Sequence, residues 1–200
     1  LSMNKGNLFR QIQIEFEKLG YDLKHEVLNA VDYGVPQYRE RVILIGIKGK
    51  NNFVYPSPTH GEGLKPYVTL REAIGDLPVL RSGEESNIYA TDTTNDFLKF
   101  VRKNSRGYLE EHKAPKNGEH LIKIMQTLKD GQSKDDLPDD IRPKSGYGNT
   151  YAKLWWDKPS TTITRNFACP SSSRCIHPRD SRAMSIREGA RLQSFPDDYK

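Results

Sequence analysis

The chain has little of several features that would settle its class at once. Only two of its 200 residues are cysteines, too few for a disulfide-rich scaffold, so a reducing compartment is expected. No apolar run approaches the roughly 20 residues of a membrane-spanning helix, and charged side chains recur near the start, so neither an anchor nor a signal peptide is predicted. Neither Gly-x-x-x-x-Gly-Lys nor Gly-x-Gly-x-x-Gly occurs, so no main nucleotide-binding turn is expected here.

Metal or thiol chemistry has weak support in the sequence. Cys169 and Cys175 stand six positions apart with His177 nearby, but no second half completes the four ligands of a structural zinc site. A catalytic thiolate helped by Arg174 and Arg179 is a second alternative, and small, buried or half-buried structural thiols are the preferred interpretation. The five histidines lack metal-binding spacing and are interpreted as surface or polar-contact residues. No metal site is predicted.

Positive charge is what the sequence does have, and it is concentrated. The net charge is +5, but residues 141–179 hold seven basic residues against one acidic residue, directly after a run of aspartates at 135–140. This basic window is rich in Gly, Ser, Thr and Asn, with Trp155, Trp156 and Phe167 interleaved, a composition typical of loops that follow nucleic-acid phosphates. A solvated charged face is the alternative that composition leaves open.

Apolar spacing and capping signals predict a set of short elements. Helices are expected over residues 8–19, 70–76, 95–102, 119–128 and from 186 to about 195. Residues 21–30 and 158–165 read as extended, the second as a strand. The continuous apolar run at 42–47 predicts a strand buried on both faces of a mostly parallel or mixed sheet.

A polar constellation stands immediately before that apolar run. Gln37, Arg39 and Arg41 alternate, so they project to one side, where arginine forks suit a base edge or a phosphate. A structural salt bridge is the alternative that spacing leaves open. Residues 32–41 and the following strand resemble the Gln-x-Arg-x-Arg motif of DNA cytosine-5 methyltransferases.

Two further segments resemble the same family in the same order. Residues 158–164 (Lys-Pro-Ser-Thr-Thr-Ile-Thr) look like the segment that closes its target recognition domain, and residues 177–197 resemble its penultimate motif. The bacterial restriction-modification type is the nearest match, because residues 69–78 also resemble its members.

The resemblance implies an α/β fold: the C-terminal strands of a Rossmann-like methyltransferase sheet, plus a smaller, irregular mixed α/β target recognition domain. Residues 1–48 would belong to the catalytic domain and residues 49–200 to the recognition domain. The family's glycine-rich loop for S-adenosylmethionine, its Pro-Cys nucleophile and its Glu-Asn-Val do not occur, and its closing Gly-Asn motif would be expected after Lys200. We therefore expect a C-terminal portion, inactive alone, whose S-adenosylmethionine is bound mainly by the N-terminal part of the same protein or a complementary subunit.

Individual roles carry over only where the motifs match. Arg41 would reach the flipped cytosine near O2 and offset charge during attack on C6, with Arg39 and Gln37 supporting it. Thr162 matches a position that touches the DNA backbone. The expected DNA-binding residues are Lys158, Thr162, Thr164, Arg165 and Arg174. The base-reading residues are expected within 142–175, and the recognised sequence cannot be deduced.

Duplex DNA is the expected partner, in a bacterial cytoplasm and without membrane association. A stand-alone DNA-binding specificity module without catalysis is the alternative from a different class. The tRNA-directed branch of the family is a third, but the long insertion from Lys48 to Lys158 favours DNA.

Overall fold

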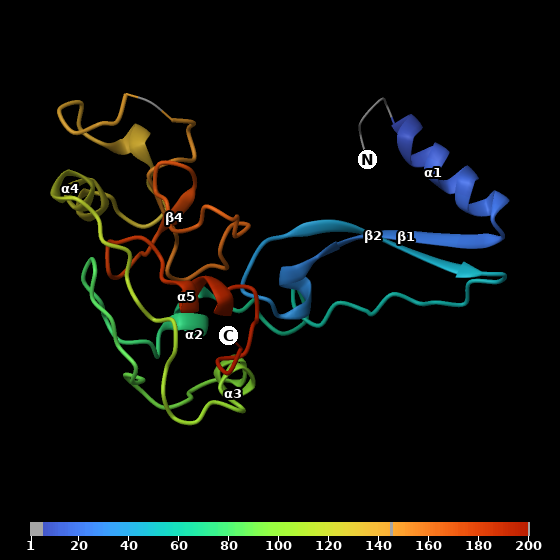
Figure 1. The fold of residues 1–200 in the computed structure, drawn as a ribbon, viewed down its shortest axis with the longest axis horizontal. Coiled ribbons are helices and arrows are strands. Elements are labelled where there is room, and N and C mark those ends of the chain that lie inside the picture. The colour runs from blue at the N-terminus through green and yellow to red at the C-terminus, as the bar shows by residue number, and fades with distance from the viewer. Residues whose placement is uncertain (1–5, 145, 200) are drawn as a thin grey trace. The chain divides into compact units, whose positions relative to one another are not determined.

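The structure is a computed structural model that describes residues 6–144 and 146–199 (Figure 1). The chain forms two compact units. Unit 1 comprises Leu1–Asn29 and Glu40–Pro58, and unit 2 comprises Ala30–Arg39 and Thr59–Lys200. The functional division predicted at residue 48 stays a prediction.

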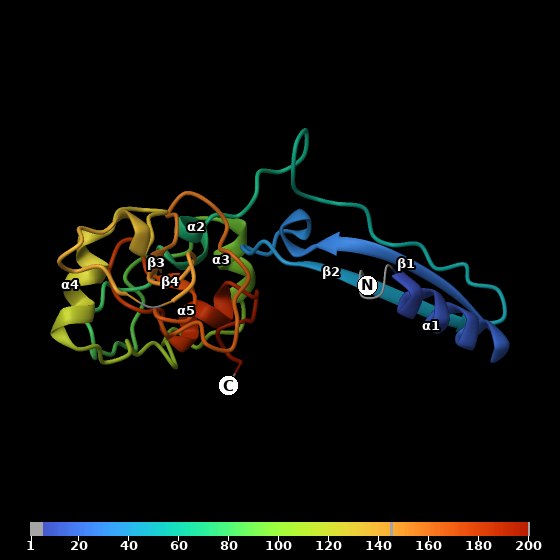
Figure 2. The ribbon, with the colours of Figure 1, turned by 90° about the horizontal axis from the view of Figure 1, so that it is seen from above.

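Unit 1 is one helix beside a β-hairpin. The helix α1 (Asn7–Lys18) is followed by strand β1 (Tyr21–Asn29), which pairs antiparallel with β2 (Glu40–Lys48) from Tyr21 opposite Lys48 to Asn29 opposite Glu40. Gly20, at φ +80°, allows the tight turn between α1 and β1. Two aromatic contacts, Phe9 with His25 and Phe16 with Tyr21, hold α1 beside β1 (Figure 2). The helix and the extended segment predicted here are confirmed.

The burial predicted for the apolar strand is wrong for the described chain. The strand is present, but its partner is antiparallel and its side chains are largely open: Ile43, Leu44 and Ile47 are 39%, 37% and 39% exposed. A two-stranded sheet with one helix beside it cannot cover both faces of a strand. An apolar run indicates that a strand favours burial, but other elements must provide the layer that covers it.

Unit 2 is built from short elements joined by long loops. They are η2 (Ala30–Tyr33), α2 (Leu70–Ile74), α3 (Asp96–Val101), α4 (Glu119–Thr127), η3 (Lys134–Asp136), β3 (Ala152–Lys153), β4 (Arg174–Ile176) and α5 (Ile186–Arg191). β3 and β4 pair in parallel. The four helices predicted in this region are present. Among the described residues no helix is long and apolar enough to span a membrane.

The strand predicted over 158–165 is wrong. The segment makes only an isolated bridge, from Ser160 to Gln37, and Lys158 lies in a bend while Arg165 lies in a turn. Its backbone groups pair with a loop and a helix start instead: the Lys158 carbonyl accepts from the Leu70 N–H at 3.0 Å, and Ser160 N donates to the Pro36 carbonyl at 2.9 Å. The alternating pattern therefore does not correspond to a strand here, because the segment pairs with no neighbouring strand.

Two apolar clusters stabilise unit 2. α2 contacts α3 and α5 (Figure 1). α2 and α3 supply half of the buried residues of the larger cluster, and loop residues such as Leu154 and Ile163 supply others. The smaller cluster forms around α4 and includes Ile124, Met125 and Ile176. Both predicted capping boxes are present: Thr69 and Glu72 exchange hydrogen bonds at the start of α2, and Ser185 and Glu188 do so at the start of α5.

Candidate nucleic-acid interface

Two of the three sequence motifs lie side by side within unit 2. Tyr38 N donates to the Ser160 carbonyl at 2.9 Å, and the Ser160 hydroxyl donates to the Pro36 carbonyl at 3.0 Å. The Thr162 hydroxyl then donates to the Tyr38 carbonyl at 2.8 Å. The loop that carries Gln37 and Arg39 is thus joined, residue by residue, to the segment 158–165.

Gln37 connects this pair of segments to the third motif. Its side chain is 1% exposed, and its Nε2 donates to the Leu192 carbonyl at 3.0 Å, at the end of α5. Its Oε1 accepts from Ile163 N at 2.9 Å. The network assigns the amide orientation, because a carbonyl and an N–H flank it on opposite sides. One buried amide therefore joins segments that are more than 120 residues apart in sequence.

The two arginines of the motif fall in different units. Arg39 is in unit 2, half-buried, and its Nη1 donates to the Ile163 carbonyl at 3.3 Å. Arg41 is on β2 in unit 1, with an exposed side chain whose Nη1 donates to the neighbouring Glu40 carbonyl at 2.6 Å. The structure thus groups Gln37 and Arg39 with Thr162, while Arg41 presents its guanidinium on the hairpin.

The segment after this junction is exposed and positively charged. Thr162, Thr164, Arg165 and Lys158 all have exposed side chains, whereas Ile163 between them is 7% exposed and points into the core. The buried Ile163 side chain therefore fixes the position of the exposed hydroxyl and cationic groups around it. Hydroxyls and cations are the donors that commonly contact phosphate oxygens.

Arg174 is engaged within the protein. Its Nη1 donates to the carbonyls of Gly131 at 2.8 Å and Lys153 at 2.6 Å, and its guanidinium lies 4.4 Å from the Trp155 ring centre. The ammonium of Lys158 lies 5.6 Å from the same ring. Arg174 thus braces the tryptophan while Lys158 stays exposed, a difference that charge counting along the sequence does not reveal.

A buried ionic network supports α5. Arg191 is fully buried and pairs with Asp76 and with Asp197, the latter at 2.7 Å. Tyr89 donates its hydroxyl to Asp197 at 2.8 Å. The ion pair between Asp76 and Arg191 could not be predicted from local patterns, because the partners are 115 residues apart in sequence.

A second buried cluster surrounds His177, next to α5. Arg182 donates to Glu188 at 2.6 and 2.9 Å and to Asp180 at 2.8 Å. Burial alone would raise the pKa of Glu188, but His177 and the hydrogen-bonded Arg182 hold it well below its ordinary value. His177, Asp180 and Glu188 offer ligand atoms within 4.8 Å of one another. The Arg182 guanidinium already occupies both carboxylates, so we interpret the group as an ion-pair cluster.

Of the two alternatives predicted for the histidines, polar contact holds for His112 and His177, which are 1% and 0% exposed. His112 Nδ1 lies 3.0 Å from the Ser185 hydroxyl and His177 Nδ1 accepts from Asp180 N at 3.0 Å, while burial lowers the pKa of His177 to about 4. The interpretation of the cysteines needs correction at one position. Cys175 is buried, and burial raises its pKa to about 12, as a structural thiol requires. Cys169, in contrast, is exposed, and hydrogen bonds with Ser171 and then Ser172 lower its pKa. Local sequence does not predict which of these residues are buried, because their burial depends on tertiary contacts.

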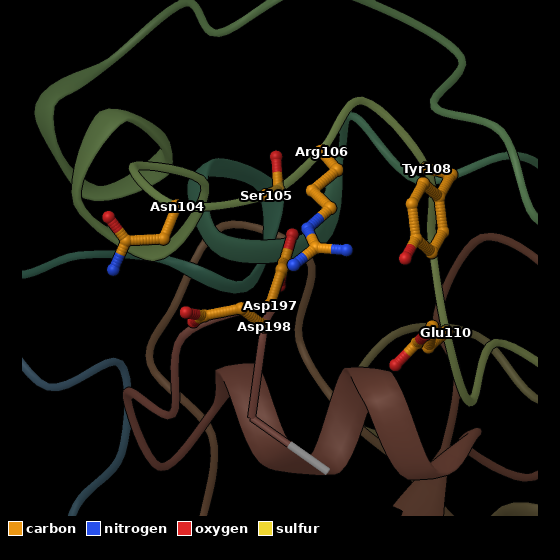
Figure 3. A pocket seen from close by; sticks show the side chains of 7 residues that line it. All are labelled: Asn104, Ser105, Arg106, Tyr108, Glu110, Asp197 and Asp198. Atoms are coloured by element: carbon orange, nitrogen blue, oxygen red, sulfur yellow. The ribbon is translucent and has the colours of Figure 1, made fainter.

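One pocket in unit 2 is acidic and unsuited to phosphate. It has a volume of about 390 Å³ and is lined by Asn104, Ser105, Arg106, Tyr108, Glu110, Asp197 and Asp198 (Figure 3). Three carboxylates against one guanidinium repel an anion. Asp197 is also already paired with Arg191.

Two glycines of unit 2 with positive φ are packed closely against side chains. Gly34 and Gly131 have positive φ, but a Cβ on Gly34 would lie 2.7 Å from the His60 ring and one on Gly131 would lie 2.1 Å from Trp155 Nε1. Side chains of the protein fill both turns, so neither of these two glycines is open to a ligand.

The fold is that of a DNA methyltransferase. Of the solved structures, one described as a DNA modification methyltransferase encoded within a prophage (E. coli) superposes with a TM-score of 0.69 at 20% identity, covering 97% of this chain and 56% of that one. The chain belongs to the C-5 cytosine-specific DNA methylase family, whose profile matches residues 1–200.

Named relatives are bacterial type II methyltransferases. The chain is 35% identical to M1.HphI of Haemophilus parahaemolyticus over 196 residues, covering 98% of this chain and 45% of that protein. It is 33% identical to M.NgoFVII of Neisseria gonorrhoeae over 208 residues, covering 100% and 48%. A shorter match, 54% identity over 81 residues, links it to M.BspRI of Lysinibacillus sphaericus and covers 38% and 19%. The chain spans about half the length of the first two relatives.

Proposed function

We propose that this chain is the DNA-recognition and base-holding portion of a bacterial DNA cytosine-5 methyltransferase. The observation that carries the proposal is the junction at Gln37, which joins the Gln-x-Arg-x-Arg loop, the segment 158–165 and α5 through buried hydrogen bonds. In a family that methylates cytosine in DNA, such a junction fixes the base-holding loop against a DNA-contacting segment.

In this proposal, residues outside this chain supply the cofactor-binding and nucleophilic groups. S-adenosylmethionine supplies the methyl group when bound, and the family's glycine-rich loop, Pro-Cys and Glu-Asn-Val come from the remaining part of the same protein or from a complementary subunit. The chain alone is then inactive. Its own contribution is to bind the duplex and to hold the flipped cytosine.

Phosphate binding is assigned to the exposed part of the segment 158–165. Lys158, Thr164 and Arg165 present donors outward, while the Thr162 hydroxyl ties the segment to the loop. Arg174 contributes less than Arg165, because its Nη1 is held by carbonyls of the protein. Phosphate contacts of this kind give affinity that falls steeply with salt.

Arg41 is assigned to the target base. Its exposed guanidinium can donate to cytosine O2, and that contact strengthens as charge develops on the ring during attack at C6. In the methylation-competent assembly, Arg41→Ala should therefore reduce turnover much more than duplex affinity. Arg10→Ala, an exposed arginine on α1, is the control and should change neither. Equal losses of turnover and affinity for Arg41→Ala would indicate a backbone contact or a structural role.

The proposal is tested by binding and methyl-transfer assays on the chain. We expect salt-dependent binding to duplex DNA, weaker binding to tRNA, and methyl transfer only after the complementary part is added. Methyl transfer by the isolated chain with S-adenosylmethionine would refute the inactivity. Tighter binding to tRNA would favour the tRNA-directed branch, and specific binding that no complement converts into methylation would favour a stand-alone specificity module.

A further inference from the structure

Tyr147 is unusually open for an aromatic residue. Its side chain is 85% exposed, the highest value among the described large hydrophobic residues that are exposed. It is also the one member of that group within residues 142–175. Burial of an exposed tyrosine ring against a partner is favourable, and the hydroxyl can form a hydrogen bond at the same time. The exposure of Tyr147 leaves both the ring and the hydroxyl available to a partner.

We propose that Tyr147 contacts a base edge of the bound duplex and contributes to sequence discrimination. The inference rests on the proposed DNA-binding function and names one of its base-reading residues. The ring suits the thymine methyl group or an open base face, and the hydroxyl can donate to or accept from a base edge in the major groove.

The tip that carries Tyr147 is held in place by the protein itself. The Tyr147 carbonyl accepts from the Thr150 hydroxyl at 2.7 Å and from Thr150 N at 3.0 Å, and Thr150 is 1% exposed. Gly146 has φ +103°, and a Cβ there would lie 2.5 Å from Thr150 Oγ1, so the turn requires glycine. The Lys134 ammonium also donates to the Gly146 carbonyl. Because this turn is already ordered, it loses less conformational entropy when it binds a partner.

Charge near the tip argues for a base contact over a phosphate contact. Asp135 is exposed, and its Oδ2 would lie 3.6 Å from a Cβ on Gly148, directly after Tyr147. Together with the Lys134 ammonium at the Gly146 carbonyl, this carboxylate leaves the tip without net positive charge, so phosphate oxygens are not specifically attracted to it. The carboxylate is compatible with a major-groove edge, where the amino groups of cytosine and adenine are donors. The exposed cations Lys158 and Arg165 lie elsewhere in the window and can serve the phosphates.

Other exposed aromatic residues lack this combination. Tyr108 borders the acidic pocket, and the Tyr199 ring lies 4.7 Å from the Phe195 ring, which partly covers it. Phe100 belongs to α3, outside the basic window. Tyr108 is thus a suitable control, since it is an exposed tyrosine of the same unit, 44% open, in an acidic setting.

The test is selection of bound duplexes from a randomised DNA pool by the whole 200-residue chain, followed by affinity measurements at several salt concentrations. We expect Tyr147→Ala to lower the preference at one or two base positions by about tenfold, within the usual cost of a mismatched pair. The salt slope and the affinity for unrelated DNA should stay unchanged, because no phosphate contact is lost. Tyr147→Phe should retain the part of the preference that the ring supplies, and Tyr108→Ala should match the wild type.

Each outcome distinguishes the two proposals. Unchanged discrimination by Tyr147→Ala, or uniform weakening on all sequences with a smaller salt slope, would overturn the base contact while leaving the proposed function intact. Wild-type binding without any sequence preference would also overturn it. Failure of the wild-type chain to bind duplex DNA would overturn the proposed function, and this assignment with it. Thermal melting of Tyr147→Ala confirms folding, since the side chain is outside the core.

Discussion

Replacing Gln37 by alanine removes the amide that joins three segments of unit 2. Two partners lose their hydrogen bonds: the Ile163 N–H and the Leu192 carbonyl, both in buried surroundings. A buried polar group left without a partner costs about 1–3 kcal/mol, so the two together should cost about 2–6 kcal/mol of unfolding free energy. Loss of side-chain packing at a position only 1% exposed adds to this.

Urea unfolding followed by tryptophan fluorescence measures this cost, because Trp155 and Trp156 both lie in unit 2. Gln193→Ala is the matched control: this glutamine is exposed, and its amide makes only a 3.5 Å contact with the carbonyl of Gly189. Its replacement should change the free energy of unfolding by less than about 0.5 kcal/mol.

A loss of unfolding free energy below about 1 kcal/mol for Gln37→Ala, or a loss equal to that of the control, would refute the reasoning. Two buried polar groups left without hydrogen bonds are expected to cost more than that. A second readout is duplex affinity under conditions where the variant remains folded. The segment 158–165 loses its anchor at Ile163, so affinity should fall, whereas Gln193→Ala should leave it unchanged.

Three further outcomes are expected in the same unfolding assay. Arg191→Met removes the guanidinium shared by two buried carboxylates, those of Asp76 and Asp197, and leaves them only their longer contacts with Arg102 at 3.2 Å and Arg187 at 3.7 Å. It should cost about 3–5 kcal/mol, against at most about 1 kcal/mol for Lys99→Ala, whose ion pair is exposed. Burial lowers the pKa of His177 from 6.5 to about 4, so the unfolded chain binds more protons than the folded chain between these pH values. The free energy of unfolding should therefore fall as pH is lowered through this range. His177→Gln should flatten that slope by up to about 1.4 kcal/mol per pH unit. Gly131→Ala combines φ +78° with a clash against a tryptophan and should cost clearly more than Gly63→Ala, which has φ +73° but open space; equal costs would show that backbone strain alone decides.

Local signals in the sequence determined most element positions. The capping boxes at Thr69 and Ser185 place two helix starts because each motif satisfies backbone donors within four consecutive residues. The apolar spacing before Gly20 likewise places α1. The three family motifs, read in order, also identified a family that the comparisons confirm.

Tertiary structure alone decided what surrounds those elements. Burial of the strand at 42–47 depends on a covering layer. Whether the segment 158–165 forms a strand depends on which backbone lies beside it. The roles of Gln37 and Arg174, one a buried connector and the other a brace for an aromatic ring, arise from partners dozens of residues away or more. A sequence specifies the donors and acceptors of each residue, but which of them meet is fixed only when the chain closes on itself, because that pairing is non-local.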